Sequence, residues 1–118
     1  MAISVGDIYF TANLTDLSGD GAESFSFVAT TAIAAGEVIT FHGPESAFTV
    51  GNSSFTFTVG AAGLSAFDRV TIVESSLVPN TIILASDPSG GSTSAVSGNG
   101  WSITDNDNII AAQGGQVL

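Results

Sequence analysis

Apolar and polar residues alternate with a period of two along most of this chain, which is typical of half-buried β-strands. The alternation is clearest in 24–30 and 53–59, where phenylalanines alternate with serine and threonine. In 7–14 the same alternation predicts one face made of Ile8, Phe10, Ala12 and Leu14. Shorter apolar runs predict further strands at 38–42, 69–73, 81–85, 101–103 and 108–111.

Clusters of Gly, Asn, Asp, Ser and Pro separate these segments and predict turns between them. The Gly- and Ser-rich segment 87–100 predicts a long loop that either binds a ligand or only links strands. Helix signals are weak. Many short strands predict an all-β fold, an antiparallel β-sandwich of immunoglobulin-like or jelly-roll-like type with about seven to nine short strands. The length fits one domain, residues 1–118.

One internal repeat is visible between AIAAGEVITF and GLSAFDRVTI, in which Ile33 corresponds to Leu64. Both segments have an apolar residue, then a tight turn with an acid, Glu37 or Asp68, and then a strand. Two similar strand starts within one sandwich explain the repeat most simply. An internal duplication is the alternative, although the flanking residues do not match.

The charge balance is extreme, with eleven acidic residues against one basic residue, Arg69, and a net charge of −10. Nucleic-acid binding needs cationic side chains at the phosphates, so we expect no nucleic-acid partner. An anionic membrane surface is disfavoured for the same reason, and no apolar run is long enough for a membrane-spanning helix. A metal cation is the partner that this charge favours.

The sequence also bears on where the protein acts. Without lysine, a trypsin-like protease has only Arg69 as a cleavage site, which favours an exposed location. The N-terminal MAISVGDIYF has neither a basic segment nor a long apolar run, so it does not resemble a cleaved signal peptide. We expect an extracellular, cell-surface or matrix location reached without a cleaved leader. A virion surface is the alternative, and retention inside the cell stays open.

The chain carries few groups suited to catalysis. His42 is the single histidine and cysteine is absent, so the usual zinc ligands are not available. No nucleophile-elbow motif is present, and a pair of catalytic carboxylates would need a deep cleft. We therefore expect a protein that is not an enzyme.

Two acidic segments are candidates for calcium binding, because calcium prefers oxygen ligands from carboxylates and carbonyls. The candidate ligands are Asp16, Asp20 and Glu23 in the first segment and Asp105 and Asp107 in the second. Neither segment matches the EF-hand pattern. A solvated polar turn explains the same residues, because Asp, Asn and Gly are favoured in turns. Both interpretations stay open.

Apolar residues outside the predicted core indicate an interface. Those on predicted outer faces or in loops are Tyr9, Val28, Phe48 and Phe67. The termini predict apolar assembly arms at 1–6 and 112–118. Their candidate interface residues are Ile3, Val5, Val117 and Leu118. Such an arm can add a strand to a neighbouring sheet, and docking on its own domain is the alternative.

The stretch GDIYFTANLTDLSGDGAESFSFVATTAIAAGEVITF resembles a β-rich domain of large bacterial surface and exported proteins. That family typically has a Gly-Asp-Ile strand, a polar loop, a Phe-Ser-Phe-Val strand and an Ile-Ala-Ala-Gly turn. AAGLSAFDRVTIV and DNDNIIAAQGG are similar to it as well, whereas HGPES after Phe41 departs from its Thr-Asp-Asn-Gly-Trp run. The resemblance implies an extracellular, non-enzymatic module of a kind that is often calcium-rich and leaderless.

The few catalytic groups, the apolar termini and the acidic composition favour a structural protein. We expect it to assemble with copies of itself into an extracellular filament, surface layer or matrix fibre, with calcium as a stabilising ion. The expected mechanism is head-to-tail strand addition by an end segment. A decoration or tail protein of a phage or other virion is the first alternative. A module that binds cell-surface glycans on Trp101 and Tyr9 is the second.

Overall fold

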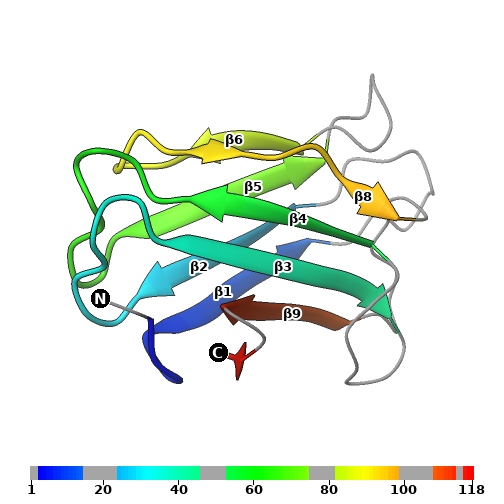
Figure 1. Ribbon diagram of the computed structural model, residues 1–118, viewed down its shortest axis with the longest axis horizontal. Helices are drawn as coiled ribbons and strands as arrows, with labels where there is room; N and C mark the ends of the chain where they lie inside the picture. The colour runs from blue at the N-terminus through cyan, green and yellow to red at the C-terminus, as the bar shows by residue number, and fades with distance from the viewer. Residues whose placement is uncertain (1–2, 15–23, 46–52, 75–81, 99–107, 114–115) are drawn as a thin grey trace.

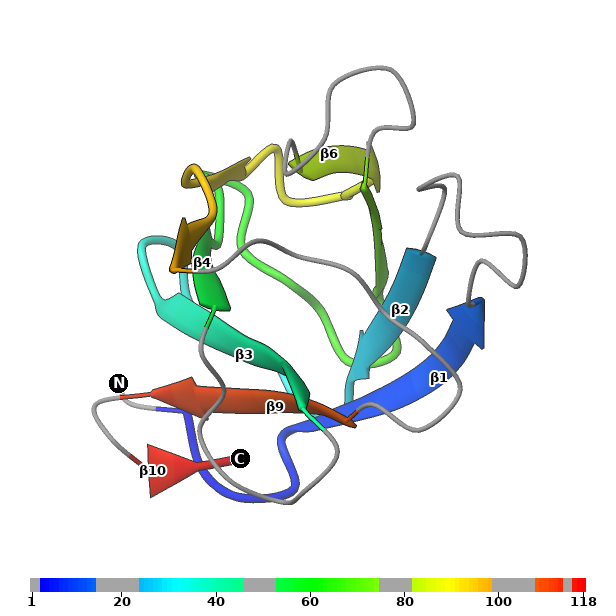
Figure 2. The same cartoon turned by 90° about the vertical axis from the view of Figure 1, so that its right-hand side faces the viewer.

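The computed structural model describes residues 3–14, 24–45, 53–74, 82–98, 108–113 and 116–118. In these ranges the chain forms two antiparallel β-sheets that pack face to face without closing into a barrel (Figures 1 and 2). The predicted antiparallel β-sandwich is therefore confirmed. No helix in the described ranges is long and apolar enough to cross a membrane.

The smaller sheet has four strands in the order β1-β2-β5-β6. They are β1 (Ile8–Leu14), β2 (Ser24–Ala29), β5 (Arg69–Glu74) and β6 (Ile82–Ser86). The larger sheet follows the order β10-β9-β3-β4-β7, with β8 also paired with β4. Its strands are β3 (Val38–Glu45), β4 (Ser53–Thr58), β7 (Ser92–Thr93), β8 (Ser97–Gly98), β9 (Asn108–Gln113) and β10 (Gln116–Val117).

The phenylalanines of the alternating segments fill the space between the sheets. Phe25 and Phe27 of β2 and Phe55 and Phe57 of β4 are all fully buried. Phe41 of β3 lies among them, with its ring centroid 5.1 Å from that of Phe25 and 5.4 Å from that of Phe55. Successive side chains of a strand point to opposite faces, so β4 buries Phe55 and Phe57 on one face and places the half-buried Ser54, Thr56 and Thr58 on the other.

Strand β1 departs from the simple alternation. Its register with β2 shifts between Phe10 and Ala12, so that Phe10 pairs with Phe27 while Asn13, and not Ala12, pairs with Phe25. A β-bulge adds one residue to a strand and thereby reverses the alternation beyond it. The prediction that one face runs unbroken from Ile8 to Leu14 does not hold in this backbone register.

The Gly- and Ser-rich segment 87–100 contains two short strands, although the sequence predicts only a loop there. β7 pairs with the end of β4 and β8 with its start. The two thus form one interrupted edge, and with that edge counted once the described residues hold nine strands, within the predicted range. The predicted strand 101–103 and Phe48 lie outside the described residues.

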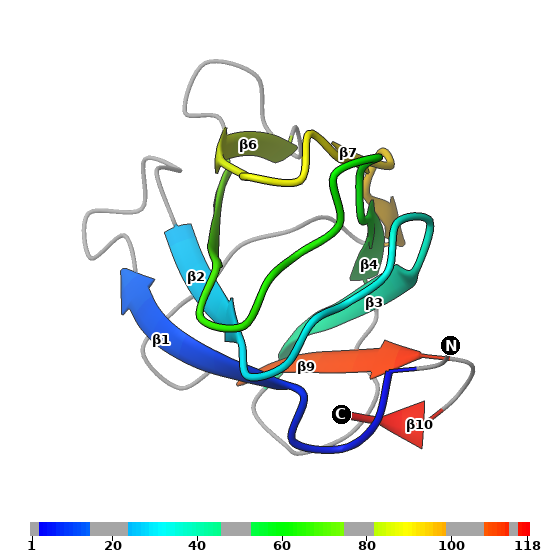
Figure 3. The same cartoon turned by 90° about the vertical axis from the view of Figure 1, so that its left-hand side faces the viewer.

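Two arches cross between the sheets at one end of the sandwich (Figure 3). The first arch, 30–37, leads from β2 to β3, and the second arch, 59–68, leads from β4 to β5. They meet at an antiparallel bridge in which the N–H of Ile33 donates to the carbonyl of Leu64 at 2.8 Å and the reverse bond is 2.9 Å. The two copies of the internal repeat therefore contact each other directly.

The strands that flank the arches are related in the same way. Phe25 of β2 pairs with Ile72 of β5, and Phe55 of β4 pairs with Phe41 of β3. The two arches and these two strand pairs are therefore equivalent in topology, with β2 corresponding to β4 and β3 to β5. The repeat thus marks structurally equivalent segments on the two sheets.

Candidate assembly surfaces

The five candidate calcium ligands, Asp16, Asp20, Glu23, Asp105 and Asp107, lie outside the described residues. Within the described ranges no group of three or more His, Asp or Glu side chains is arranged to hold a metal ion. Calcium binding by the two acidic loops stays a prediction.

The two residues of the predicted N-terminal arm lie in different environments. Ile3 is only 4% exposed and belongs to the core, whereas Val5 is 64% exposed. The N–H of Ile3 donates to Gln113 Oε1 at 2.7 Å, and Gln113 Nε2 donates to Glu37 Oε2 at 2.7 Å. Gln113 therefore ties the N-terminal segment to β9 and to the first arch. Val5 presents its side chain to solvent.

The C-terminal segment folds back on the domain. β10 pairs with β9, and the N–H of Leu118 donates to the carbonyl of Ala111 at 2.9 Å. Leu118 packs against the core and is partly buried, whereas Val117 is exposed. Ile3 and Leu118 thus pack on their own domain, and Val5 and Val117 are the arm residues that present their side chains to solvent.

The four-stranded sheet ends in two edge strands, β1 with the sequence IYFTANL and β6 with IILAS. Neither strand contains a charged residue or proline, which natural edge strands commonly use to prevent pairing with another chain. Tyr9 on β1 is 63% exposed, and Ile83 on β6 is exposed as well. Both strands also carry a β-bulge, which limits edge pairing, so the stretches suited to pairing with another molecule are the regular ones, Ile8–Phe10 and Ile82–Leu84.

Three turns share one hydrogen-bonding pattern, two of them in the arches and one in the N-terminal segment. In Ser4–Asp7, Ala34–Glu37 and Ser65–Asp68 the fourth N–H donates to the first carbonyl, at 3.1, 3.4 and 3.0 Å. Asp7 and Asp68 also accept the N–H of the serine in their own turn, at 2.7 and 2.8 Å. The third residue has a positive φ in every case, and these residues are Gly6, Gly36 and Phe67.

The exposed surface of the two arches is largely apolar. Phe67 is 80% exposed, and small apolar side chains dominate the other exposed positions. The exposed alanines are Ala32, Ala34, Ala35, Ala61, Ala62 and Ala66. Apolar surface of this kind is typical of a contact with another protein. Residues 30–37 and 59–68 together are called the arch end below.

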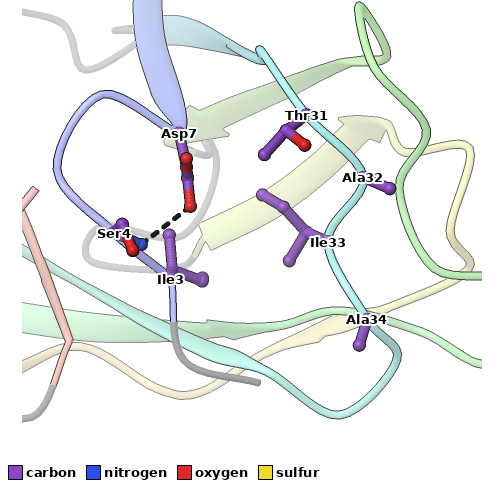
Figure 4. Close-up of a pocket in the computed structure, with 7 residues that line it drawn as sticks. All are labelled: Ile3, Ser4, Asp7, Thr31, Ala32, Ile33 and Ala34. Carbon is purple, nitrogen blue, oxygen red and sulfur yellow. Dashed lines mark hydrogen bonds between the residues drawn. The ribbon is translucent and has the colours of Figure 1, made fainter.

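A pocket of about 260 Å³ opens beside the first arch (Figure 4). It is lined by Ile3, Ser4, Asp7, Thr31, Ala32, Ile33 and Ala34. Ile33 faces Ile3 across the hollow, and Asp7 Oδ2 accepts the N–H of Ser4 at 2.7 Å. Pockets for small molecules usually measure about 300–1,000 Å³. This pocket therefore has room for one side chain or ring rather than for a whole metabolite.

The remaining candidates lie away from this pocket. His42 is on β3, where it pairs with Ser54 on one side and Ile110 on the other. Tyr9, a proposed stacking residue for glycans, is on the β1 edge, and Trp101 lies outside the described residues. The sequence predicted neither the edge strands nor the pocket. Strand order decides which strands are edges, and the pocket forms between two segments, 3–7 and 31–34, that only the fold brings together. The one available signal was the lack of charge in IYFTANL and IILAS.

Comparisons with protein-family models, with curated proteins and with solved structures found no match. The structure is an all-β, two-sheet domain, and the comparisons identify no family for it. The function has to be argued from the surfaces themselves.

Proposed function

We propose that this protein is a structural subunit that assembles with copies of itself into an extracellular filament, surface layer or matrix fibre. The observation that carries the proposal is the pair of uncharged edge strands, β1 and β6, at opposite sides of one sheet. An uncharged, apolar edge strand is a ready template for pairing with another chain.

The strand directions allow the two edges to pair with each other in successive copies. The pairs β1-β2, β2-β5 and β5-β6 are all antiparallel, so β6 runs opposite to β1. A second copy placed beside the first in the same orientation brings its β1 against β6 as an antiparallel neighbour. Contacts between two different edges that do not close into a ring give an open-ended polymer.

Apolar side chains at the two edges support the same contact. Tyr9 lies opposite Val28 in the register and Ile83 lies opposite Val73, both on the outer face of the sheet. When the edges pair, Tyr9 and Ile83 of neighbouring copies become cross-strand neighbours on that face, and such apolar pairs stabilise sheets. The exposed Val5 and Val117 offer a second route, in which an end segment docks on the next subunit.

The charge of the chain opposes assembly and gives calcium a role. Each copy carries a net charge of −10, so neighbouring copies repel at low ionic strength. Calcium bound at the acidic loops would offset part of this repulsion. Assembly should then be stronger in calcium than in the same ionic strength of sodium chloride.

The test is light scattering and negative-stain microscopy of purified protein in calcium, in sodium chloride and in chelator. Wild type should form filaments or sheets. Tyr9→Glu on β1 and Ile83→Glu on β6 should each abolish the filaments or sheets. Val28→Glu is the matched control, since it adds the same charge to the same face on the interior strand β2.

A mixing experiment tests whether the contact joins two different edges. The Tyr9→Glu variant keeps an intact β6 and the Ile83→Glu variant an intact β1, so an equimolar mixture should form edge-paired heterodimers and no edge-paired polymer. A wild type that stays monomeric under all conditions would refute the self-assembling function. A stable small oligomer would favour the virion protein, and a monomer that binds glycans would favour the carbohydrate-binding module.

A further inference from the structure

Phe67 has a backbone conformation that its side chain opposes. Its φ is 72°, and among the described residues it is the one residue other than glycine with a positive φ. The left-handed region brings the Cβ of an L-residue too close to the backbone, and a bulky residue there is a genuine outlier. Residues with such backbone strain cluster at sites of binding, catalysis or switching, where the strained residue serves function rather than stability.

The chain itself shows which residue this turn prefers. The equivalent positions in the two related turns are Gly6 and Gly36, with φ values of 89° and 86°. Phe67 and Gly36 also make the same bond, since the N–H of Phe67 donates to Ala29 O at 2.6 Å and that of Gly36 to Val59 O at 2.8 Å. Glycine therefore satisfies the fold at this position. With 80% of Phe67 exposed, its ring adds little to the core.

The pocket beside the first arch suits an incoming phenyl ring. Its volume is about 260 Å³, and an apolar cavity of about 150 Å³ already accommodates benzene. Ile3, Ile33 and Ala34 provide apolar lining, and the carboxylate of Asp7 is part of the wall. Phe67 and the pocket lie at the same end of the sandwich, since Ala29, which accepts the N–H of Phe67, is followed by Thr30, whose N–H donates to Asp7 O at 2.8 Å.

The charges near Phe67 indicate a second copy of this chain as the partner. Arg69, the single basic residue among eleven acids, lies two positions after Phe67 and is exposed. Asp68 lies between them and accepts the N–H of Ser65, so Arg69 is the cation that this end of one copy offers to a pocket whose one charged lining residue is Asp7. The ring and the pocket lie on one end of the same molecule, so two copies can each supply both halves. That reciprocity is the property of a two-fold contact.

We propose that two copies pair through their arch ends about a two-fold axis, with Phe67 of each copy inserted into the pocket of the other. This inference rests on the proposed self-assembly and adds a second contact to it. The arches lie at the ends of the strands, whereas β1 and β6 lie at the sides of the sheet. The arch-end contact would therefore join two edge-paired polymers into a double filament.

The experiment isolates this contact by starting from the double variant Tyr9→Glu/Ile83→Glu, in which both sheet edges are blocked. Sedimentation equilibrium of this protein should show a monomer–dimer equilibrium. Adding Phe67→Gly should weaken the dimer at least about 30-fold, the loss expected for one central aromatic anchor. The melting temperature of the monomer should not fall, because glycine is the residue that the two related turns already use.

Two further variants test the pocket half of the contact. Ala34→Leu fills the pocket and should also abolish the dimer, whereas Ala85→Leu, at an exposed position on β6 outside the pocket, should leave it unchanged. The inference is overturned if the edge-blocked protein is monomeric at high concentration, or if Phe67→Gly or Ala34→Leu leaves the dimer intact. Polymerisation of the wild type would still stand in each of these cases, so failure of this contact is distinct from failure of the proposed function.

Discussion

Gly91 lies where the turn between β6 and β7 packs against β4, and we expect it to tolerate no side chain. A Cβ added there would lie 2.2 Å from the carbonyl oxygen of Thr58 and 3.0 Å from Asp87 Oδ2. Non-bonded carbon atoms pack at about 3.5–4.0 Å, so Gly91→Ala has to move the turn from β4 by roughly 1 Å or more. The adjacent Gly90 is a matched control, since its Cβ would meet open space and its strain comes only from a φ of 69°.

The movement would break a charged hydrogen-bond network. Asp87 Oδ2 accepts the N–H of Gly91 at 2.6 Å, and Asp87 Oδ1 accepts the N–H of Ser89 at 2.9 Å. Losing one hydrogen bond to a charged group costs about 1.5–3 kcal/mol, and overpacking adds about 1–3 kcal/mol. We expect Gly91→Ala to lower the free energy of unfolding by about 3–5 kcal/mol. Gly90→Ala should lower it by about 1–2 kcal/mol, the cost of a left-handed L-residue.

Urea denaturation followed by far-UV circular dichroism measures both values on the same scale. The slope of the unfolding free energy against urea should stay the same, so that a shift in midpoint reports stability alone. The contact between the turn and β4 would be wrong as described if Gly91→Ala destabilised the protein no more than Gly90→Ala. Equal losses would mean that backbone conformation, and not the close approach to Thr58, governs both positions.

Two further predictions concern the core and the N-terminal segment. Phe41→Ala should lower the free energy of unfolding by about 3–5 kcal/mol in the same assay, because Phe41 is fully buried between the rings of Phe25 and Phe55; a loss below 1 kcal/mol would contradict this packing. Gln113→Ala should speed hydrogen exchange at the amide of Ile3, whose N–H donates to Gln113 Oε1, and leave the amide of Ile72 in β5 protected; unchanged exchange at Ile3 would contradict that bond.

The strands that the sequence predicts best are those in which burial alone decides the pattern. β2 and β4 each bury two phenylalanines two positions apart, so the buried face of each strand follows directly from the residue types. The bulge after Phe10 does not follow, because an extra residue in one strand is defined only by its pairing with the other. β7 and β8 are likewise specified by β4, and two residues of serine, threonine or glycine carry no strand signal alone.

Some features of the candidate surfaces could be predicted from the sequence, and others could not. Exposure of Phe67 and Tyr9 was predictable, because both fall outside the apolar face of their segments. The burial of Ile3 was not, since it packs in the core and its N–H donates to the side chain of Gln113, 110 residues away in the chain. Which strands form the edges of a sheet also depends on pairing between strands that are far apart in the chain. The sequence of β1 becomes informative about assembly only once its place in the sheet is known.

The internal repeat is the one feature in which the sequence carried tertiary information. Its two copies bridge each other at Ile33 and Leu64. Each arch also makes the same backbone hydrogen bonds as the other at equivalent positions, so the two arches share one backbone conformation. Where both copies obey that constraint, residues of similar type recur, as Glu37 and Asp68 do. Gly36 and Phe67 break the pattern at a position where the backbone favours glycine. Since the first arch shows that the fold is satisfied without a ring there, the reason for Phe67 has to be sought in what the exposed ring contacts outside its own domain.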